Sequence, residues 1–322
     1  MKTIWRDMRN VRMDSATLLH GLGILKRFFL GKEINKGLIF RLFMYLVLID
    51  VAFIYIKPII YMVSTMIKDS ANLLDPSVIW VPRSFYTGHL QEALRLLKYS
   101  QAFTISMTVS LSIAVLQVIT CAIAGYAFAR LEFPLKKTLF VCLIFTFVMP
   151  PQATILPSIL LFKQLGWINT YLPLIIPAFF GHGLKGTLFV IIFRQFFGTL
   201  PKELEEASKI DGAGPFRIFF RVMLPISTSA IIVVFLFSFV WSWNDFYYPS
   251  MYMFASKEVP LSISLSQMAV SLSSEAEQSG PSIFAEPIKM AASFLIIMPV
   301  LIVYTFTQRW FVEGVERTGI VE

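Results

Sequence analysis

The sequence is poor in the residues from which enzymes build their active sites. It has two cysteines and three histidines in 322 residues, and no Gly-x-x-x-x-Gly-Lys-Ser/Thr phosphate loop. Cys121 and Cys142 both lie in apolar segments, which favours a packing role over a disulfide or a metal pair. We therefore expect this chain to contain no catalytic residue, no metal site and no bound cofactor.

Charged residues are also scarce, at 15% of the chain, whereas hydrophobic residues make up 56%. This composition excludes an ordinary soluble domain. Six apolar stretches are long enough to cross about 30 Å of hydrocarbon. They lie near residues 38–66, 101–129, 138–162, 171–197, 223–248 and 287–311. The sequence thus predicts an all-α polytopic membrane protein with six transmembrane helices, the third and fourth interrupted by prolines.

Basic residues are distributed unevenly among the connections. Residues 1–41 and the connections near 130–137 and 194–221 hold most of the 28 lysines and arginines. By the positive-inside rule, these segments and both termini are cytoplasmic. The same bias explains the net charge of +8, so no nucleic-acid partner is expected.

Three segments outside the spans invite further predictions. Residues 1–37 form an N-terminal extension, which is either an amphipathic helix on the cytoplasmic face of the bilayer or a solvated arm. On the outer side, the connections 67–100 and 249–286 are long enough for small folded caps on which a soluble partner could dock. The alternating run Val259–Leu265 predicts a strand within the second of these.

The polar stretch 200–225 stands between two apolar segments. Pro201 suits the first turn of a helix, and the acidic residues after it suit the positive end of the helix dipole. Gly212 can adopt the left-handed conformation that ends a helix, and Pro215 can open a second one. We expect two short helices joined by a tight turn; the alternative is an ordinary charged turn between spans.

This stretch also carries a family motif. It contains Glu206-Ala207-Ser208, then Gly212, then Val222-Met223-Leu224-Pro225. The spacing resembles the EAA loop of ATP-binding-cassette (ABC) importers. Two positions depart from the family pattern, because Ser208 stands in place of Ala and Val222 in place of Ile. Both substitutes are small or apolar, so the match is little weakened.

Motifs elsewhere narrow the resemblance to the permease subunits of maltose- and glycerol-phosphate-type importers. They are Ala124–Arg130 leading to Phe133, Met149-Pro150 followed by Leu165–Thr170, Trp243–Phe246 with Pro249, and Phe311–Gly314. The resemblance implies the type I ABC importer permease fold over residues 38–322. It also implies a place in the bacterial cytoplasmic membrane.

The resemblance implies a mechanism as well. In the family, the first helix of the loop inserts into a groove on an ATPase subunit and moves with it when ATP binds. The residues that match this role are Leu204, Glu206, Ala207, Ser208, Ile210, Asp211, Gly212, Leu224 and Pro225. The implied partners are a second homologous permease, an ABC ATPase dimer that uses ATP and Mg, an extracytoplasmic solute-binding protein and a sugar or oligosaccharide.

Candidates for the substrate path are polar groups inside the spans, which are costly there and usually face a cavity or a partner. They are Asp50 and Lys57 in the first span, His182 and Lys185 in the fourth, and Asn244 and Asp245 at the outer end of the fifth. Packing between helices or an interfacial belt would explain the same residues. Basic residues in the spans favour an acidic sugar without excluding a neutral one.

Two rival functions remain open. An ion-coupled secondary transporter would use Asp50 as its coupling site and would need no ATPase-docking loop. A membrane scaffold without transport activity is the third possibility. Association with an ABC ATPase separates the first function from both rivals.

Overall fold

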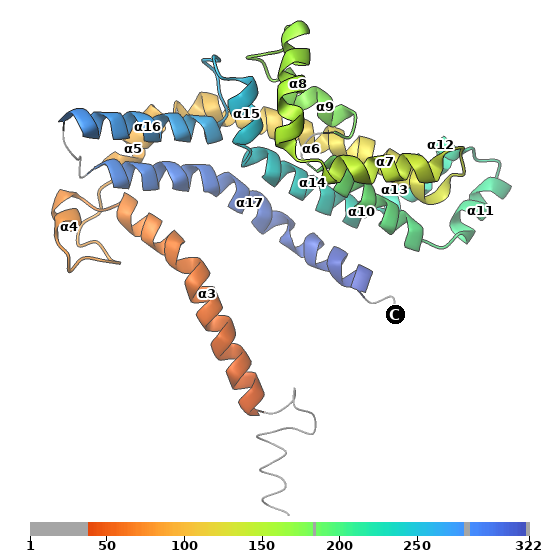
Figure 1. Cartoon of the computed structure of the whole chain (residues 1–322). Helices are drawn as coiled ribbons and strands as arrows, with labels where there is room; N and C mark the ends of the chain where they lie inside the picture. The colour runs from red at the N-terminus through yellow and green to blue at the C-terminus, as the bar shows by residue number, and fades with distance from the viewer. Residues whose placement is uncertain (1–37, 183–184, 280–283, 320–322) are drawn as a thin grey trace, which may run out of the picture. The chain divides into compact units, whose positions relative to one another are not determined.

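The computed structural model describes residues 38–182, 185–279 and 284–319 (Figure 1). Every element in these ranges is helical, and they contain no strand. The chain divides into two units, residues 1–64 and residues 65–322, which we describe separately. The predicted N-terminal extension, residues 1–37, lies outside the described residues.

The first unit contributes the helix α3 (Leu38–Met66), which matches the first predicted span. Its 29 residues are apolar almost throughout, with Pro58 inside the helix. Side chains from residue 41 to residue 61 are exposed, Asp50 and Lys57 among them. The helix is long and apolar enough to cross a bilayer.

In the second unit, α6 (Tyr99–Arg130) and α17 (Ala285–Gly319) are long continuous helices of spanning length. Two further candidates are bent. The helix α7 (Lys136–Val148) meets α8 (Pro151–Gln164) at 98°, and the segment Pro215–Ile226 meets α14 (Thr228–Trp243) at 78°. The described residues therefore contain three candidate spans, or up to five if each bent pair is one span.

The expected fourth span is two helices, α9 (Leu172–Phe179) and α10 (Gly186–Thr199). Gly181 and Lys185 both have positive φ, +67° and +59°, a conformation that a right-handed helix does not contain. With 14 residues, α10 rises about 21 Å, less than a bilayer's hydrocarbon thickness. The count of six continuous spans is thus a prediction that this geometry does not confirm.

The main core lies where α6, α10 and α14 pack together (Figure 1). Its buried members include Tyr126 from α6, Phe193 and Phe197 from α10, and Val234 from α14. Gly125 permits the close approach of α6 to α10, because a Cβ there would lie 2.5 Å from the Cβ of Phe193. This contact accounts for glycine in the motif Ala124–Arg130.

The connection after residue 66 is a folded cap with the short helices α4 (Ser70–Leu74) and α5 (Gly88–Leu96). The buried Lys68 donates from Nζ to the carbonyls of Val78 and Ile79, at 2.8 and 2.9 Å. Asp69 caps α4, and the hydrogen bond that it accepts from Ser84 lowers the pKa of this carboxyl. The expectation of a folded cap is met in this connection.

The expected strand Val259–Leu265 is wrong, because this run opens the helix α16 (Leu261–Ser279). The alternating serines that resemble a strand pattern bond to neighbouring elements instead. Ser264 donates to the carbonyl of Leu97 at 2.7 Å, and Ser262 donates to the carbonyl of Asp245 at 2.7 Å. These tertiary hydrogen bonds override the local strand pattern.

Gly125→Ala is expected to lower the unfolding temperature of the purified protein. Overpacking of a tight helix contact costs roughly 1–3 kcal/mol, which exceeds the gain in helix propensity. Thermal unfolding in detergent measures this. Gly198→Ala on α10 is the matched control, because an added Cβ meets nothing within 4 Å there. Equal stability of the two variants would contradict the tight packing at Gly125.

Candidate functional site

The loop 200–225 forms two short helices, as predicted. They are α11 (Glu203–Ile210) and α12 (Pro215–Ile218), and the loop projects at one end of the second unit (Figure 1). Gly212 has φ +74° and ends the first helix, while Pro215 opens the second. One detail was wrong: α11 begins at Glu203, so Pro201 precedes the helix and does not occupy its first turn.

One side of α11 is free and the other is anchored. Glu206 and Ala207 are exposed, and Ile210 is 87% exposed. Leu204 is half-buried and accepts a hydrogen bond from Ser208 Oγ at 2.8 Å. Of the apolar residues on α11 that the resemblance assigns to docking, Ala207 and Ile210 are therefore open to a partner, and Leu204 lies partly in the fold.

The second half of the loop is built into the core. After α12 comes a π-helical turn, Phe219–Met223, and then the short helix α13 (Leu224–Ile226), which contains Pro225. Ile218, Phe219 and Met223 are buried in the core between α6 and α10, and Leu224 packs against it.

Two residues of the loop have roles that the sequence did not reveal. Phe216, in the second helix of the loop, is 80% exposed although it is aromatic. Glu205 is the buried member of α11, whereas its acidic neighbours Glu203 and Glu206 are exposed. The dipole of the helix favours all three carboxylates alike. Their different burial therefore depends on the fold and not on their place in the helix.

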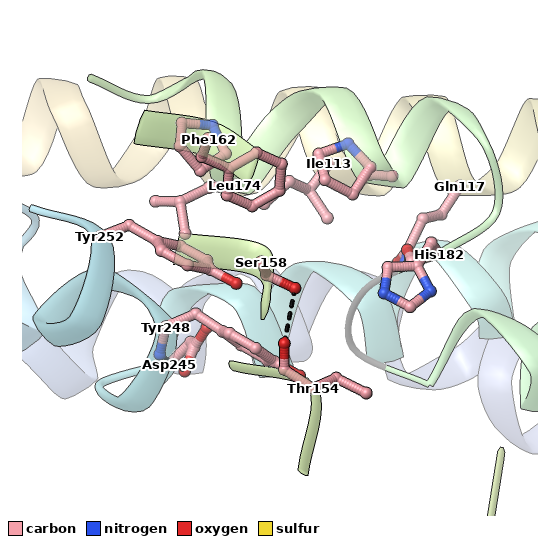
Figure 2. Close-up of a pocket in the computed structure, with 13 residues that line it drawn as sticks. Ile113, Gln117, Thr154, Ser158, Phe162, Leu174, His182, Asp245, Tyr248 and Tyr252 are labelled. Carbon is pink, nitrogen blue, oxygen red and sulfur yellow. Dashed lines mark hydrogen bonds between the residues drawn. The ribbon is translucent and has the colours of Figure 1, made fainter. Parts of the chain in front are cut away.

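A cavity of about 50 Å³ lies between α6, α8 and α9 and the residues that follow α14 (Figure 2). That volume holds a few water molecules at roughly 10–15 Å³ each. Its polar lining comes from Gln117, Thr154, Ser158, His182, Asp245 and Tyr248, and its aromatic lining from Phe162, Tyr248 and Tyr252. Polar groups beside aromatic faces inside a membrane region are suited to a hydroxyl-rich ligand.

The structure separates the predicted path residues. His182 and Asp245 line the cavity together. Lys185 does not, because its Nζ lies 4.3 Å above the ring of Trp241 in a cation–π contact. Asn244 donates to the carbonyl of Val240 at 2.9 Å and is also absent from the lining. Asp50 and Lys57 belong to the first unit, whose position relative to this cavity is not described.

Side chains of α6 hold the helix break beside the cavity. Gln117 donates to the carbonyl of His182 at 3.0 Å, Thr120 to that of Phe179 at 2.8 Å, and Cys121 Sγ to that of Gly186 at 3.5 Å. Ser238 of α14 donates in turn to Gln117 Oε1 at 2.6 Å. Carbonyls freed by a broken helix must find donors inside a membrane, and α6 supplies them.

Asn169 holds Tyr252, a residue of the cavity lining. Its backbone N–H donates to the carbonyl of Tyr252 at 2.8 Å, and its Oδ1 accepts from the N–H of Ala255 at 2.9 Å. The connection from α8 to α9 is thereby joined to α15 (Tyr247–Tyr252). Asp245 accepts from the N–H of Tyr248 at 3.3 Å, in the first turn of the same helix. The motif Leu165–Thr170 thus holds Tyr252 in place from outside the lining, and the motif Trp243–Phe246 contributes Asp245 to the lining.

A family model described as "Binding-protein-dependent transport system inner membrane component" matches residues 93–317. The chain belongs to this family. The match includes the loop, the cavity-lining residues and the core of the second unit.

Named relatives extend over most of the chain. The sn-glycerol-3-phosphate transport system permease protein UgpE of Brucella abortus is 30% identical over 88% of this chain and 97% of its own length. An osmoprotective compounds uptake permease protein, GgtD, of Synechocystis is 29% identical over 85% of this chain and 90% of its own length. The permease is therefore an ABC transport component of the inner membrane, and not an enzyme.

A solved structure shares the fold. It is a bacterial ABC transporter involved in the import of the acidic polysaccharide alginate. One of its chains superposes with a TM-score of 0.72 at 21% identity, and the match covers 85% of this chain and 96% of that one. The type I permease architecture expected from the motifs is the fold observed.

Gln117→Leu is expected to destabilise the break between α9 and α10. It leaves the carbonyl of His182 and the hydroxyl of Ser238 without their partner, at a cost of about 1–3 kcal/mol for each buried group. Hydrogen exchange of the peptide that spans residues 179–188 should rise. Gln195→Leu, at an exposed position on α10, is the control. Unchanged exchange in Gln117→Leu would show that α6 does not hold the break.

Proposed function

We propose that this permease is one of two membrane subunits of a binding-protein-dependent importer for a sugar or a sugar-like polyol. A partner ATPase dimer docks on the loop 200–225 and drives transport with ATP and Mg. An extracytoplasmic binding protein delivers the cargo. In this proposal the subunit has six spans, with the loop and both termini in the cytoplasm of a bacterial cell.

One observation carries the docking role. The helix α11 presents Ala207 and Ile210 to solvent at the end of the unit, and Phe216 on the second helix of the same loop is exposed as well. Several exposed apolar side chains on one short loop favour a partner surface. The small Ala207 lets another protein approach closely, and Gly212 and Asp211 set the angle to the anchored second helix. A short helix transmits force as a rigid body, whereas a flexible loop would bend.

The cargo class is supported by the cavity and by the relatives. The hydroxyl, amide and imidazole groups of the lining suit sugar hydroxyls, and the tyrosines suit the apolar face of a sugar ring. Relatives are named for glycerol-3-phosphate and osmoprotective compounds, and the structural neighbour imports an acidic polysaccharide. Anionic cargo is therefore included among the candidates.

The ion-coupled carrier with Asp50 as its coupling site is the rival. It predicts a protein that is fully active alone, whereas the importer requires the ATPase. Co-purification of the tagged permease with an ABC ATPase, followed by transport with and without that ATPase, decides between them. Transport by the permease alone would overturn the importer.

Ala207→Glu and Gly212→Asp are expected to abolish ATPase association and uptake while leaving the permease in the membrane. A bulky charge at Ala207 blocks close approach, and a side chain at Gly212 must adopt a strained positive φ. Thr138→Glu, an exposed position in the first turn of α7, is the charge control and should keep the ATPase. Normal uptake by Gly212→Asp would contradict the docking assignment.

Asp245→Asn is expected to change the KM for cargo by about tenfold, which corresponds to roughly 1.4 kcal/mol of binding free energy. The neighbouring Asn244→Asp should leave KM unchanged, because Asn244 does not line the cavity. The Lys185→Met variant should likewise keep the cargo specificity of the parent protein. Uptake kinetics in proteoliposomes measure these KM values. If Asp245→Asn and Asn244→Asp have the same KM, Asp245 is not part of the substrate path.

The cargo itself is found by reconstitution. Both permeases, the ATPase and the binding protein are placed in liposomes with a neutral oligosaccharide, a uronate or glycerol-3-phosphate. The compound that stimulates ATP hydrolysis and accumulates inside is the cargo. Stimulation by none of these three would contradict the sugar and polyol assignment.

A further inference from the structure

A buried ion pair connects the loop to the spans. Arg130 is the last residue of α6, and its Nε lies 3.3 Å from Oε1 of Glu205 on α11. Their side chains are 7% and 9% exposed. Surface ion pairs are weak because water and salt screen them. This pair is enclosed, so removal of one partner leaves a buried charge uncompensated.

Arg130 also donates hydrogen bonds to the end of α10. Its Nε donates to the carbonyl of Phe197 at 2.8 Å, and its Nη2 donates to the carbonyl of Leu200. Both carbonyls lie at the C-terminus of α10, where helical partners run out and the dipole is negative. One guanidinium thus joins the ends of α6 and α10 to α11. Its planar fork of donors suits this task better than a single ammonium.

One oxygen of the Glu205 carboxylate is buried and, among the described residues, is held by the charge of Arg130 without a hydrogen bond. Its Oε1 accepts no hydrogen bond in the part of the chain that the structure describes, since the Nε proton of Arg130 is directed at Phe197. The surroundings are apolar: Tyr126, one turn before Arg130, packs its ring against Phe197 and Phe219. An enclosed charge with one partner favours a single relative position of the two helices.

The same helix reaches the cavity. α6 is continuous from Tyr99 to Arg130, and Ile113 and Gln117 on it line the cavity. Gln117 lies thirteen residues before Arg130, about 20 Å along the helix axis. A displacement of the end of α6 would therefore be carried to the cavity wall and to the break that Gln117 holds.

We propose that Arg130 and Glu205 are positioning residues that lock the ATPase-docking helix to α6, so that motion of α11 changes the cavity. This role rests on the proposed importer function. The apolar packing of Ile218 and Phe219 attaches the other half of the loop, but apolar contacts permit sliding more readily than a buried charge pair does. The ion pair fixes the register, and its loss uncouples ATP hydrolysis from the cavity.

The test compares Glu205→Gln with Glu203→Gln, its exposed neighbour on α11. Each is made in the complete transporter with Cys142→Ser and Ser158→Cys, which places a reporter thiol in the cavity. The remaining Cys121 is buried. The rate of alkylation by a water-soluble maleimide is measured without nucleotide and after trapping with ATP and vanadate. ATPase activity and ATPase co-purification are measured on the same samples.

We expect Glu205→Gln to lose the change in alkylation rate on trapping while it keeps ATPase binding and ATP hydrolysis. With Glu203→Gln, trapping should change the alkylation rate as it does in the parent. With Glu205→Gln, the ATPase should still bind and hydrolyse ATP, but the change on trapping should shrink at least about fivefold, the lower end of typical coupling factors. Arg130→Lys keeps the charge but loses the fork, and should show an intermediate response.

Two outcomes overturn the inference. One is a full alkylation response in Glu205→Gln. The other is joint loss of ATPase binding and response in both Glu205→Gln and Arg130→Lys, which would mean that the pair serves only folding. A parent protein that binds no ATPase would instead refute the proposed function, so the two failures are distinguishable.

Discussion

The structure depends on one constraint, the need to pair backbone carbonyls where a helix ends or breaks away from water. A membrane excludes water from the break before α10, and burial of Arg130, whose side chain is 7% exposed, excludes it at the end of α10, so side chains supply the donors. α6 meets this need at two levels: Gln117 serves the break before α10, and Arg130 serves the C-terminus of α10. Because both donors lie on one continuous helix, α6 connects the cavity to the loop.

This arrangement explains how an interrupted span can be stable and still functional. The break between α9 and α10 places His182 in the cavity lining, where its carbonyl accepts from Gln117, whereas in an unbroken helix the carbonyls would bond within the helix. Gly186 shows how tight the break is, since a Cβ there would lie 1.8 Å from the carbonyl oxygen of Gly181. The fold therefore uses donors from α6 in place of helical hydrogen bonds and gains an irregular, polar wall.

Apolar length and turn residues in the sequence were enough to predict the long helices and the two-helix loop, and the resemblance of its motifs to a known family predicted the family. α3, α6 and the turn at Gly212 follow from apolar length and from glycine chemistry. Tertiary contacts were not predictable. Lys185 is an intramembrane charge like His182, but its contact with Trp241 directs it away from the cavity. Glu205 looks like Glu203 in sequence, and only the packing of α11 against Arg130 distinguishes them. Tertiary hydrogen bonds also explain why residues Leu261–Ser279 form a helix where part of the run was expected to be a strand.

The central claim is that α11 and α6 move as one body. Spin labels at Lys209 on α11 and at the exposed Ile123 on α6, in a Cys142→Ser background that retains uptake, report their separation by pulsed dipolar spectroscopy. In the complete transporter, the account predicts one distance distribution that is the same without nucleotide and after trapping with ATP and vanadate. A second distance that appears on trapping would contradict it.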